Sequence, residues 1–159
     1  MVTTSEDVRL LLETKKFDII HVAMYVCPTT GDLIFSAVDP ETKKNASPKR
    51  ESMSAEMFGD LVRRCGARLV VLANNERLAL VVKLLPITSV IFALEPVDPK
   101  MIAQWIKAFY MLLSTGLSPY DACKKAFALH QIPMRLYPQL GTGIASREHQ
   151  MVGAVAAPA

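Results

Sequence analysis

Polar side chains follow two short apolar segments in the middle of the chain. Asn74 and Asn75 come directly after the apolar residues 69–73, and Glu95 comes directly after the largely apolar residues 88–94. A segment with helical periodicity separates the two, which predicts a strand, helix, strand unit with parallel strands. Ligands of parallel sheets bind outside the carboxyl ends of the strands. We therefore predict that Asn74, Asn75 and Glu95 lie at the functional edge of a sheet.

The chain contains three cysteines and three histidines, but their spacing matches no reactive or metal-binding motif. There is no CxxC pair and no zinc-ligand pattern, nor a Gly-rich phosphate loop, a GxSxG turn or an HExxH helix. We therefore expect no metal and no cofactor. An odd number of cysteines without a pairing pattern is typical of a reducing compartment. The six residues are Cys27, Cys65, Cys123, His21, His130 and His149.

Size and charge restrict the class of protein. A chain of 159 residues can bury one self-sufficient core, and a composition of 51% hydrophobic and 21% charged residues suits a sheet covered on both faces. The net charge of +3 is too small to predict nucleic-acid binding. The sequence shows no signal-peptide pattern and no apolar run of about 18 residues. We therefore expect no membrane contact and a cytoplasmic location.

Start and stop signals of helices recur along the chain. They are a Thr-x-x-Glu capping box at Thr3 and Glu6, a cap at Ser52 with a stop at Gly66, an Asp98-Pro99 start with a stop at Gly116, and a Ser118-Pro119 start. Together with the apolar periodicity they predict helices at residues 4–15, 53–65, 78–85, 98–116 and 118–130, and extended segments at residues 17–26, 33–38, 67–73, 88–94 and 132–141.

This order of elements predicts an α/β fold, a three-layer sandwich with a mostly parallel central sheet and helices on both faces. The extended segments at residues 17–26 and 33–38 flank a turn that contains Gly31, so we expect them to form a hairpin. Residues 1–141 are expected to form a single domain. Residues 142–159, which are rich in Gly and Ala and lack periodicity, are expected to be a flexible tail.

Four stretches within residues 5–130 carry specific sequence patterns in addition to their periodicity. They are residues 17–23 with the Gly31-Asp32-Leu33 that follows, residues 68–75, residues 89–98, and the helix pair Phe109-Tyr110-x-x-Leu113-x-x-Gly116-x-Ser118-x-x-x-Ala122. These stretches resemble the CHAT family of caspase-like cysteine peptidases, and the helix pair is the most specific of the four. The resemblance implies a shortened caspase-like form of the α/β sandwich.

The sequence departs from this family at both catalytic positions. Tyr25 stands where the family has the histidine that acts as base, and Asn75 stands where it has the nucleophilic cysteine. A phenol is a poor base at neutral pH, and an amide cannot replace a thiolate. His21 matches the family's first histidine and is retained. The resemblance therefore implies a pseudo-peptidase without catalytic activity.

The function expected from the resemblance is that of a protein-interaction or regulatory module, in prokaryotic defence or cell-death signalling. The residues expected to line its degenerate pocket are His21, Tyr25, Asn74, Asn75 and Glu95. The carboxylate of Glu95 would favour a basic residue in a bound peptide. One alternative is an active cysteine peptidase that uses Cys27 with His21, because alternate residues of a strand share a face. A second alternative is an α/β ligand-sensing domain unrelated to peptidases.

The expected partner is a protein, and a second copy of the chain is one candidate. Members of the family usually carry another strand and helix before the first matching segment, so the sheet is expected to lack a strand at one edge. Such an edge could pair with a second copy and form a homodimer. Alternatively, the extended segment around residues 134–141 could cap it within the chain.

Overall fold

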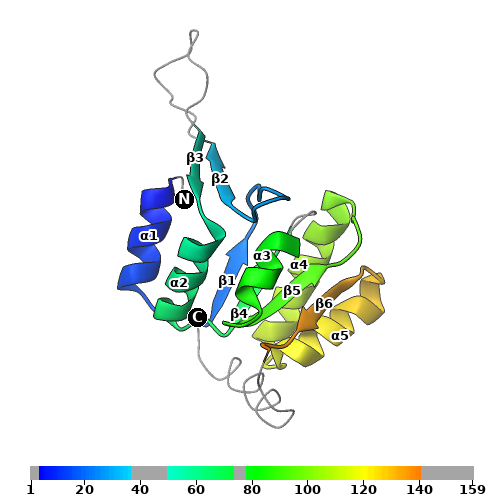
Figure 1. Ribbon diagram of the computed structural model, residues 1–159. Coiled ribbons are helices and arrows are strands. Elements are labelled where there is room, and N and C mark those ends of the chain that lie inside the picture. The colour runs from blue at the N-terminus through cyan, green and yellow to red at the C-terminus, as the bar shows by residue number, and fades with distance from the viewer. Residues whose placement is uncertain (1–3, 37–49, 74–77, 141–159) are drawn as a thin grey trace, which may run out of the picture.

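The computed structural model describes residues 4–36, 50–73 and 78–140, and these residues form a layered α/β fold (Figure 1). Residues 1–3, 37–49, 74–77 and 141–159 lie outside the described part, and with them the predicted tail at 142–159. The elements in chain order are α1 (Ser5–Thr14), β1 (Ile19–Val22), β2 (Leu33–Ser36), β3 (Arg50–Met53), α2 (Ala55–Cys65), β4 (Leu69–Leu72), α3 (Leu78–Leu84), β5 (Ser89–Ala93), α4 (Pro99–Ser114), α5 (Pro119–His130) and β6 (Met134–Tyr137).

The main sheet has four strands in the order β1-β4-β5-β6. Strands β1, β4 and β5 are parallel, with Ile19 opposite Leu69 and Leu69 opposite Ser89, so their carboxyl ends share one edge. This confirms the predicted parallel unit. Strand β6 joins β5 in antiparallel orientation, which confirms that the segment after Ile132 is extended and that it covers one edge of the sheet. In the described residues, β1 at the other edge pairs with β4 only.

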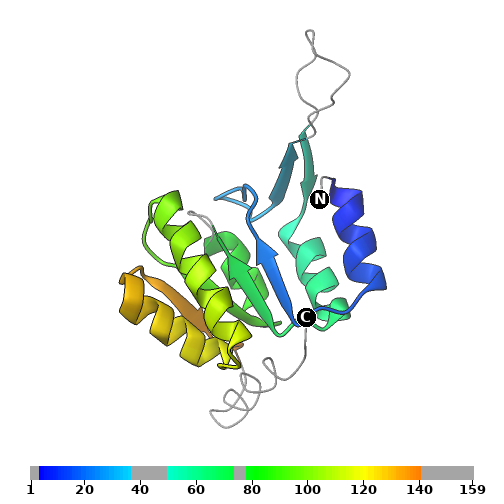
Figure 2. The ribbon, with the colours of Figure 1, turned by 180° about the vertical axis from the view of Figure 1, so that it is seen from behind.

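Helices cover both faces of the sheet, and this confirms the three-layer fold (Figure 2). Helices α2 and α3 lie on one face, where Val70 and Val90 belong to the first hydrophobic cluster, and α1 packs against α2 (Figure 1). Helices α4 and α5 pack on the opposite face, where Val71 and Ile91 belong to the second. All four residues of β4 are buried. Burial on both faces explains why the strand sequence is uniformly apolar rather than alternating.

The N-terminal strands differ from the prediction. Strand β1 ends at Val22 and does not reach residue 26. Val26 and Leu33, which lie on either side of the turn, are joined only by an isolated β-bridge. Strand β2 pairs with β3 in a separate two-stranded sheet, so the predicted hairpin is reduced to the bridge. The prediction missed β3 because its sequence, RESM, has no apolar alternation. Its pairing with β2 is decided by tertiary structure.

Two helix caps lie later in the sequence than predicted. The capping box of α1 is formed by Thr4 and Asp7. Helix α2 is capped by Ser54, whose side chain accepts a hydrogen bond from Met57 N–H, while Ser52 belongs to β3. The carboxylate of Asp32 adds a second acceptor at this helix start, 3.2 Å from Ala55 N.

The remaining helix signals are confirmed. Gly66 ends α2 with φ of +79°, a left-handed conformation that costs glycine little. Asp98 and Ser118 cap α4 and α5, and each is followed by proline at the first helical position. In the described residues no helix is both long and apolar enough to span a membrane.

Candidate functional site

A hollow of about 220 Å³ lies at the carboxyl end of β5. Three segments line it: the turn after β1, the first residue of α3, and the end of β5 with the loop that follows it. The lining residues are Pro28, Leu78, Phe92, Ala93, Leu94, Glu95 and Pro96. Leu78 and Leu94 are 61% and 65% exposed, so both present apolar surface to solvent at this hollow, and Glu95 adds a carboxylate. The arrangement can hold a side chain that is apolar along its length and cationic at its tip.

A tight turn brings Pro28 to this hollow. The N–H of Gly31 donates to Cys27 O, and the N–H of Cys27 donates to Asp32 O, both at 2.8 Å. Gly31 has φ of +78° and lies directly against the backbone of α3, where a Cβ atom would be 2.7 Å from Leu80 N. Only glycine permits this approach without displacement. The turn is therefore seated on α3, and Pro28 and Leu78 line the same hollow.

Among the described residues of the predicted pocket, Glu95 lines this hollow. Tyr25 follows β1, is 62% exposed and is not among the lining residues; its carbonyl accepts from Ile34 N–H at 3.0 Å. Asn74 and Asn75 lie outside the described residues, so the predicted approach of Tyr25 to Asn75 stays a prediction. Strand β4, which precedes both asparagines, does end beside β1, with Leu72 opposite Val22.

His21 is turned toward α4. Its ring stacks on Tyr110, with 5.8 Å between ring centroids and 18° between planes. Part of the His21 side chain remains open to solvent, but its burial against α4 lowers the pKa of His21, because the charged form loses hydration. Burial also raises the pKa of Tyr110 to about 12. The imidazole therefore contributes to the packing of α4 on the edge strand.

The lowered pKa of His21 predicts a pH dependence of stability. The unfolded chain takes up a proton at the ordinary histidine pKa of about 6.5, whereas the folded chain takes it up only at lower pH. The stabilisation that neutral His21 contributes is therefore fully present above pH 6.5. It is lost as the pH falls from the pKa of the unfolded chain to the lower pKa of the folded chain. We expect the urea midpoint to fall more steeply between pH 7 and pH 5 for the wild type than for His21→Phe, which keeps a stacked ring. Equal slopes would contradict the assignment.

The thiols occupy different environments. Hydrogen bonds from the Thr30 hydroxyl and from the backbone N–H groups of Thr30 and Thr29 lower the pKa of Cys27. Cys65 and Cys123 are buried, and burial raises the pKa of Cys123 to about 11. The expectation that strand alternation places Cys27 on the face of His21 is wrong, because β1 ends at Val22 and Cys27 belongs to the turn.

The sequence did not predict the apolar part of the hollow. Pro28, Leu78 and Leu94 belong to segments far apart in the chain, and each looks like an ordinary turn or helix residue in its local sequence. The available signal was Gly31, since a glycine in a turn beside a strand end often marks a close backbone approach. In the part of the chain described, no group of three or more His, Cys, Asp or Glu side chains could hold a metal ion.

The fold and the hollow together define an α/β three-layer protein with an apolar site at the carboxyl edge of its parallel strands. No protein-family model and no curated protein matches this chain.

Proposed function

We propose that this chain is a non-catalytic protein-interaction module, a shortened caspase-like domain that binds a peptide segment at the carboxyl edge of its sheet. The observation that carries the proposal is the hollow with two exposed leucines and the Glu95 carboxylate. The resemblance to the CHAT family supports the caspase-like assignment. A role in prokaryotic defence or cell-death signalling rests on that resemblance alone.

The surroundings of the retained histidine favour a non-catalytic role. A general base must reach the nucleophile directly or through one water molecule. The ring of His21 instead stacks on Tyr110, and the groups that hydrogen-bond to the Cys27 sulfur come from Thr29 and Thr30. Stacking on Tyr110 gives His21 a part in ordering this edge of the sheet, which supports a non-catalytic role.

The size of the hollow favours a peptide side chain over a small-molecule ligand. Pockets for drug-sized ligands usually enclose about 300–1,000 Å³, and this one has about 220 Å³. A single lysine or arginine side chain fits such a space, with its aliphatic part on Leu78 and Leu94 and its charge near Glu95. At this hollow, the ligand-sensing alternative is therefore the weaker one.

Reversing the charge of Glu95 tests the proposed function. We expect a phage-displayed library of random peptides, selected on the full chain, to yield peptides with a Lys or Arg beside apolar residues. Their affinity should fall about tenfold in Glu95→Lys, which corresponds to about 1.4 kcal/mol, because a charge-assisted contact becomes a repulsion. The matched control is Glu13→Lys, an exposed position on α1. Peptides that bind Glu95→Lys as tightly as the wild type would refute this site.

The lowered pKa of Cys27 favours a second candidate, a cysteine peptidase that uses this thiol. Faster alkylation of Cys27 than of Cys65 or Cys123 cannot decide between the two, since the other thiols are buried. The deciding variant is His21→Gln. We expect it to leave the iodoacetamide rate of Cys27 at pH 7 unchanged, whereas Thr30→Val should slow the reaction by removing a donor to the thiolate. A slower rate in His21→Gln, with mass-spectrometric identification of the site, would favour the peptidase.

We also propose that two copies of the chain form a homodimer through β1. This strand pairs with β4 alone in the described residues, and an unpaired strand edge is a template for another chain. Light scattering coupled to size exclusion measures this directly, and a monomeric mass at the highest accessible concentration would exclude it.

A further inference from the structure

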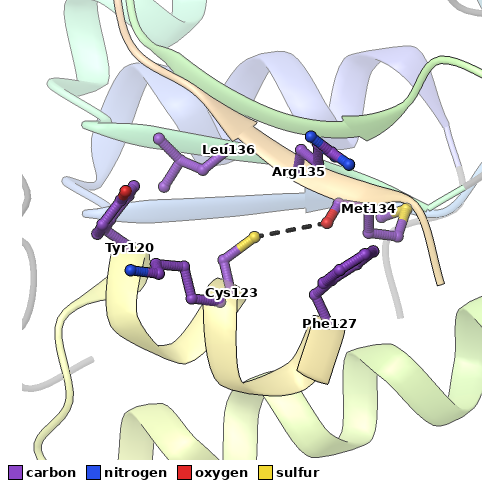
Figure 3. A pocket seen from close by; sticks show the side chains of 7 residues that line it. Tyr120, Cys123, Phe127, Met134, Arg135 and Leu136 are labelled. Carbon is purple, nitrogen blue, oxygen red and sulfur yellow. Dashed lines mark hydrogen bonds between the residues drawn. The ribbon is translucent and has the colours of Figure 1, made fainter. Parts of the chain in front are cut away.

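A second hollow, of about 350 Å³, lies between α5 and β6 (Figure 3) and shares no lining residue with the carboxyl-edge hollow. Figure 3 shows the side chains of Tyr120, Cys123 and Phe127 extending from α5 toward the strand. These residues have the spacing of one helix face, i, i+3 and i+7. The residues that line this α5–β6 groove are Tyr120, Cys123, Lys124, Phe127, Met134, Arg135 and Leu136.

The floor and the rim of the α5–β6 groove differ in chemistry. The floor is buried: Cys123 is 5% exposed and Met134 is fully buried, and the thiol donates to the Met134 carbonyl at 3.6 Å. The rim is aromatic and exposed, since Tyr120 and Phe127 retain 46% and 37% exposure. An apolar hollow with exposed aromatic walls favours insertion of an apolar side chain.

Two cations stand at the rim, each placed over an aromatic ring. Lys124 Nζ lies 5.3 Å from the centre of the Tyr120 ring, and Arg135 Cζ lies 5.4 Å from that of Phe127. None of the described residues that line the groove carries a carboxylate. The acidic residue of α5, Asp121, is engaged at the helix start, where its Oδ2 accepts from Ser118 Oγ at 2.8 Å. The groove therefore presents two positive charges, each placed over an aromatic ring.

We propose that the α5–β6 groove docks an acidic peptide segment of a partner protein. One apolar side chain of the segment enters between Tyr120 and Phe127, and neighbouring carboxylates pair with Lys124 and Arg135. Arginine and lysine that already lie over aromatic rings through cation–π contacts lose less side-chain freedom when they bind a carboxylate. This gives the chain a second docking surface, with a charge preference opposite to that of the Glu95 hollow.

Charge argues against a second copy of the chain as the occupant. A two-fold symmetric dimer places the same patch of both subunits face to face. With the two-fold axis through this groove, Arg135 and Lys124 of one copy would face the same residues of the other, and like charges brought together destabilise an interface. A partner segment with carboxylates meets no such repulsion.

The test is selection of a phage-displayed random peptide library on the full chain, followed by fluorescence anisotropy with the synthetic peptides that carry Asp or Glu beside a large apolar residue. We expect such peptides to be enriched and to bind about tenfold more weakly to Arg135→Glu and to Lys124→Glu. The matched control is Lys125→Glu, which makes the same charge change at the next residue of α5 but lies outside the groove lining. Circular dichroism verifies that each variant is folded.

Several outcomes would overturn the proposal. One is that the selection does not enrich acidic peptides. Another is that the peptides bind Arg135→Glu as tightly as the wild type, and a third is that Lys125→Glu loses as much peptide affinity as Arg135→Glu does. If the chain forms a dimer and Arg135→Glu dissociates it, the groove belongs to a second copy. If the chain sediments with phosphatidylserine vesicles and this binding requires Arg135, the groove belongs to a membrane surface. Glu95→Lys should leave the acidic peptides bound, so the result is independent of the carboxyl-edge site.

Discussion

Replacement of Gly31 by alanine should lower the free energy of unfolding by about 3 kcal/mol. Two costs add at this position. A left-handed conformation costs a residue with a Cβ roughly 1–2 kcal/mol, and Gly31 has φ of +78°. The added Cβ would also lie 2.7 Å from the Leu80 nitrogen and 3.0 Å from the Ala79 carbonyl carbon. Both neighbours are backbone of α3, which cannot rotate away, and overpacking of this kind costs roughly 1–3 kcal/mol.

Gly116→Ala is the matched control, because it isolates the conformational cost. Gly116 has φ of +91°, but an added Cβ there would meet no atom within 4 Å. Urea denaturation should therefore show a clearly smaller loss for Gly116→Ala than for Gly31→Ala. Equal losses would mean that the contact with α3 contributes nothing. If the turn moves away from α3, Pro28 moves with it, so Gly31→Ala should also weaken peptides selected for the Glu95 hollow.

Replacement of Phe109 by alanine should cost about 3–5 kcal/mol, the usual range for a buried phenylalanine. Phe109 is fully buried on α4, stacks on Trp105 at 5.0 Å and meets the edge of Tyr110 at 5.3 Å. The buried indole N–H of Trp105 has no hydrogen-bond partner in the described residues, and the contact of this ring is its stack on Phe109. The loss is large compared with the total stability of a typical domain, about 5–15 kcal/mol.

The control for this variant is Met111→Ala, on the same helix but 59% exposed. It should change the free energy of unfolding by less than about 0.5 kcal/mol. Chemical denaturation followed by Trp105 fluorescence measures both. Because Tyr110 packs between Phe109 and His21, Phe109→Ala should also shift the His21 ring resonances, and unchanged resonances would contradict a connected aromatic row.

The hollow at the carboxyl edge was only partly predictable. Glu95 could be placed there, because a residue that follows a parallel strand must lie at that edge of the sheet. Pro28 and Leu78 could not, since their approach depends on the fit of Gly31 against α3, which no local pattern records. The orientation of His21 could not be predicted either. The alternation of side chains along a strand places His21 on the same face as Ile19, but it does not show that Tyr110 of α4 covers that face.

The sequence by itself determined the elements with strong local signals. Asp98-Pro99 and Ser118-Pro119 begin α4 and α5 because capping and proline geometry act within one turn, and the apolar runs of β4 and β5 specify a sheet buried on both faces. Only the tertiary structure decided where β1 ends, that the polar β3 pairs with β2, and which side chains line the two hollows. The physical reason is range: caps and periodicity are set by neighbours in the chain, whereas strand pairing and cavity walls depend on surfaces that meet only after folding.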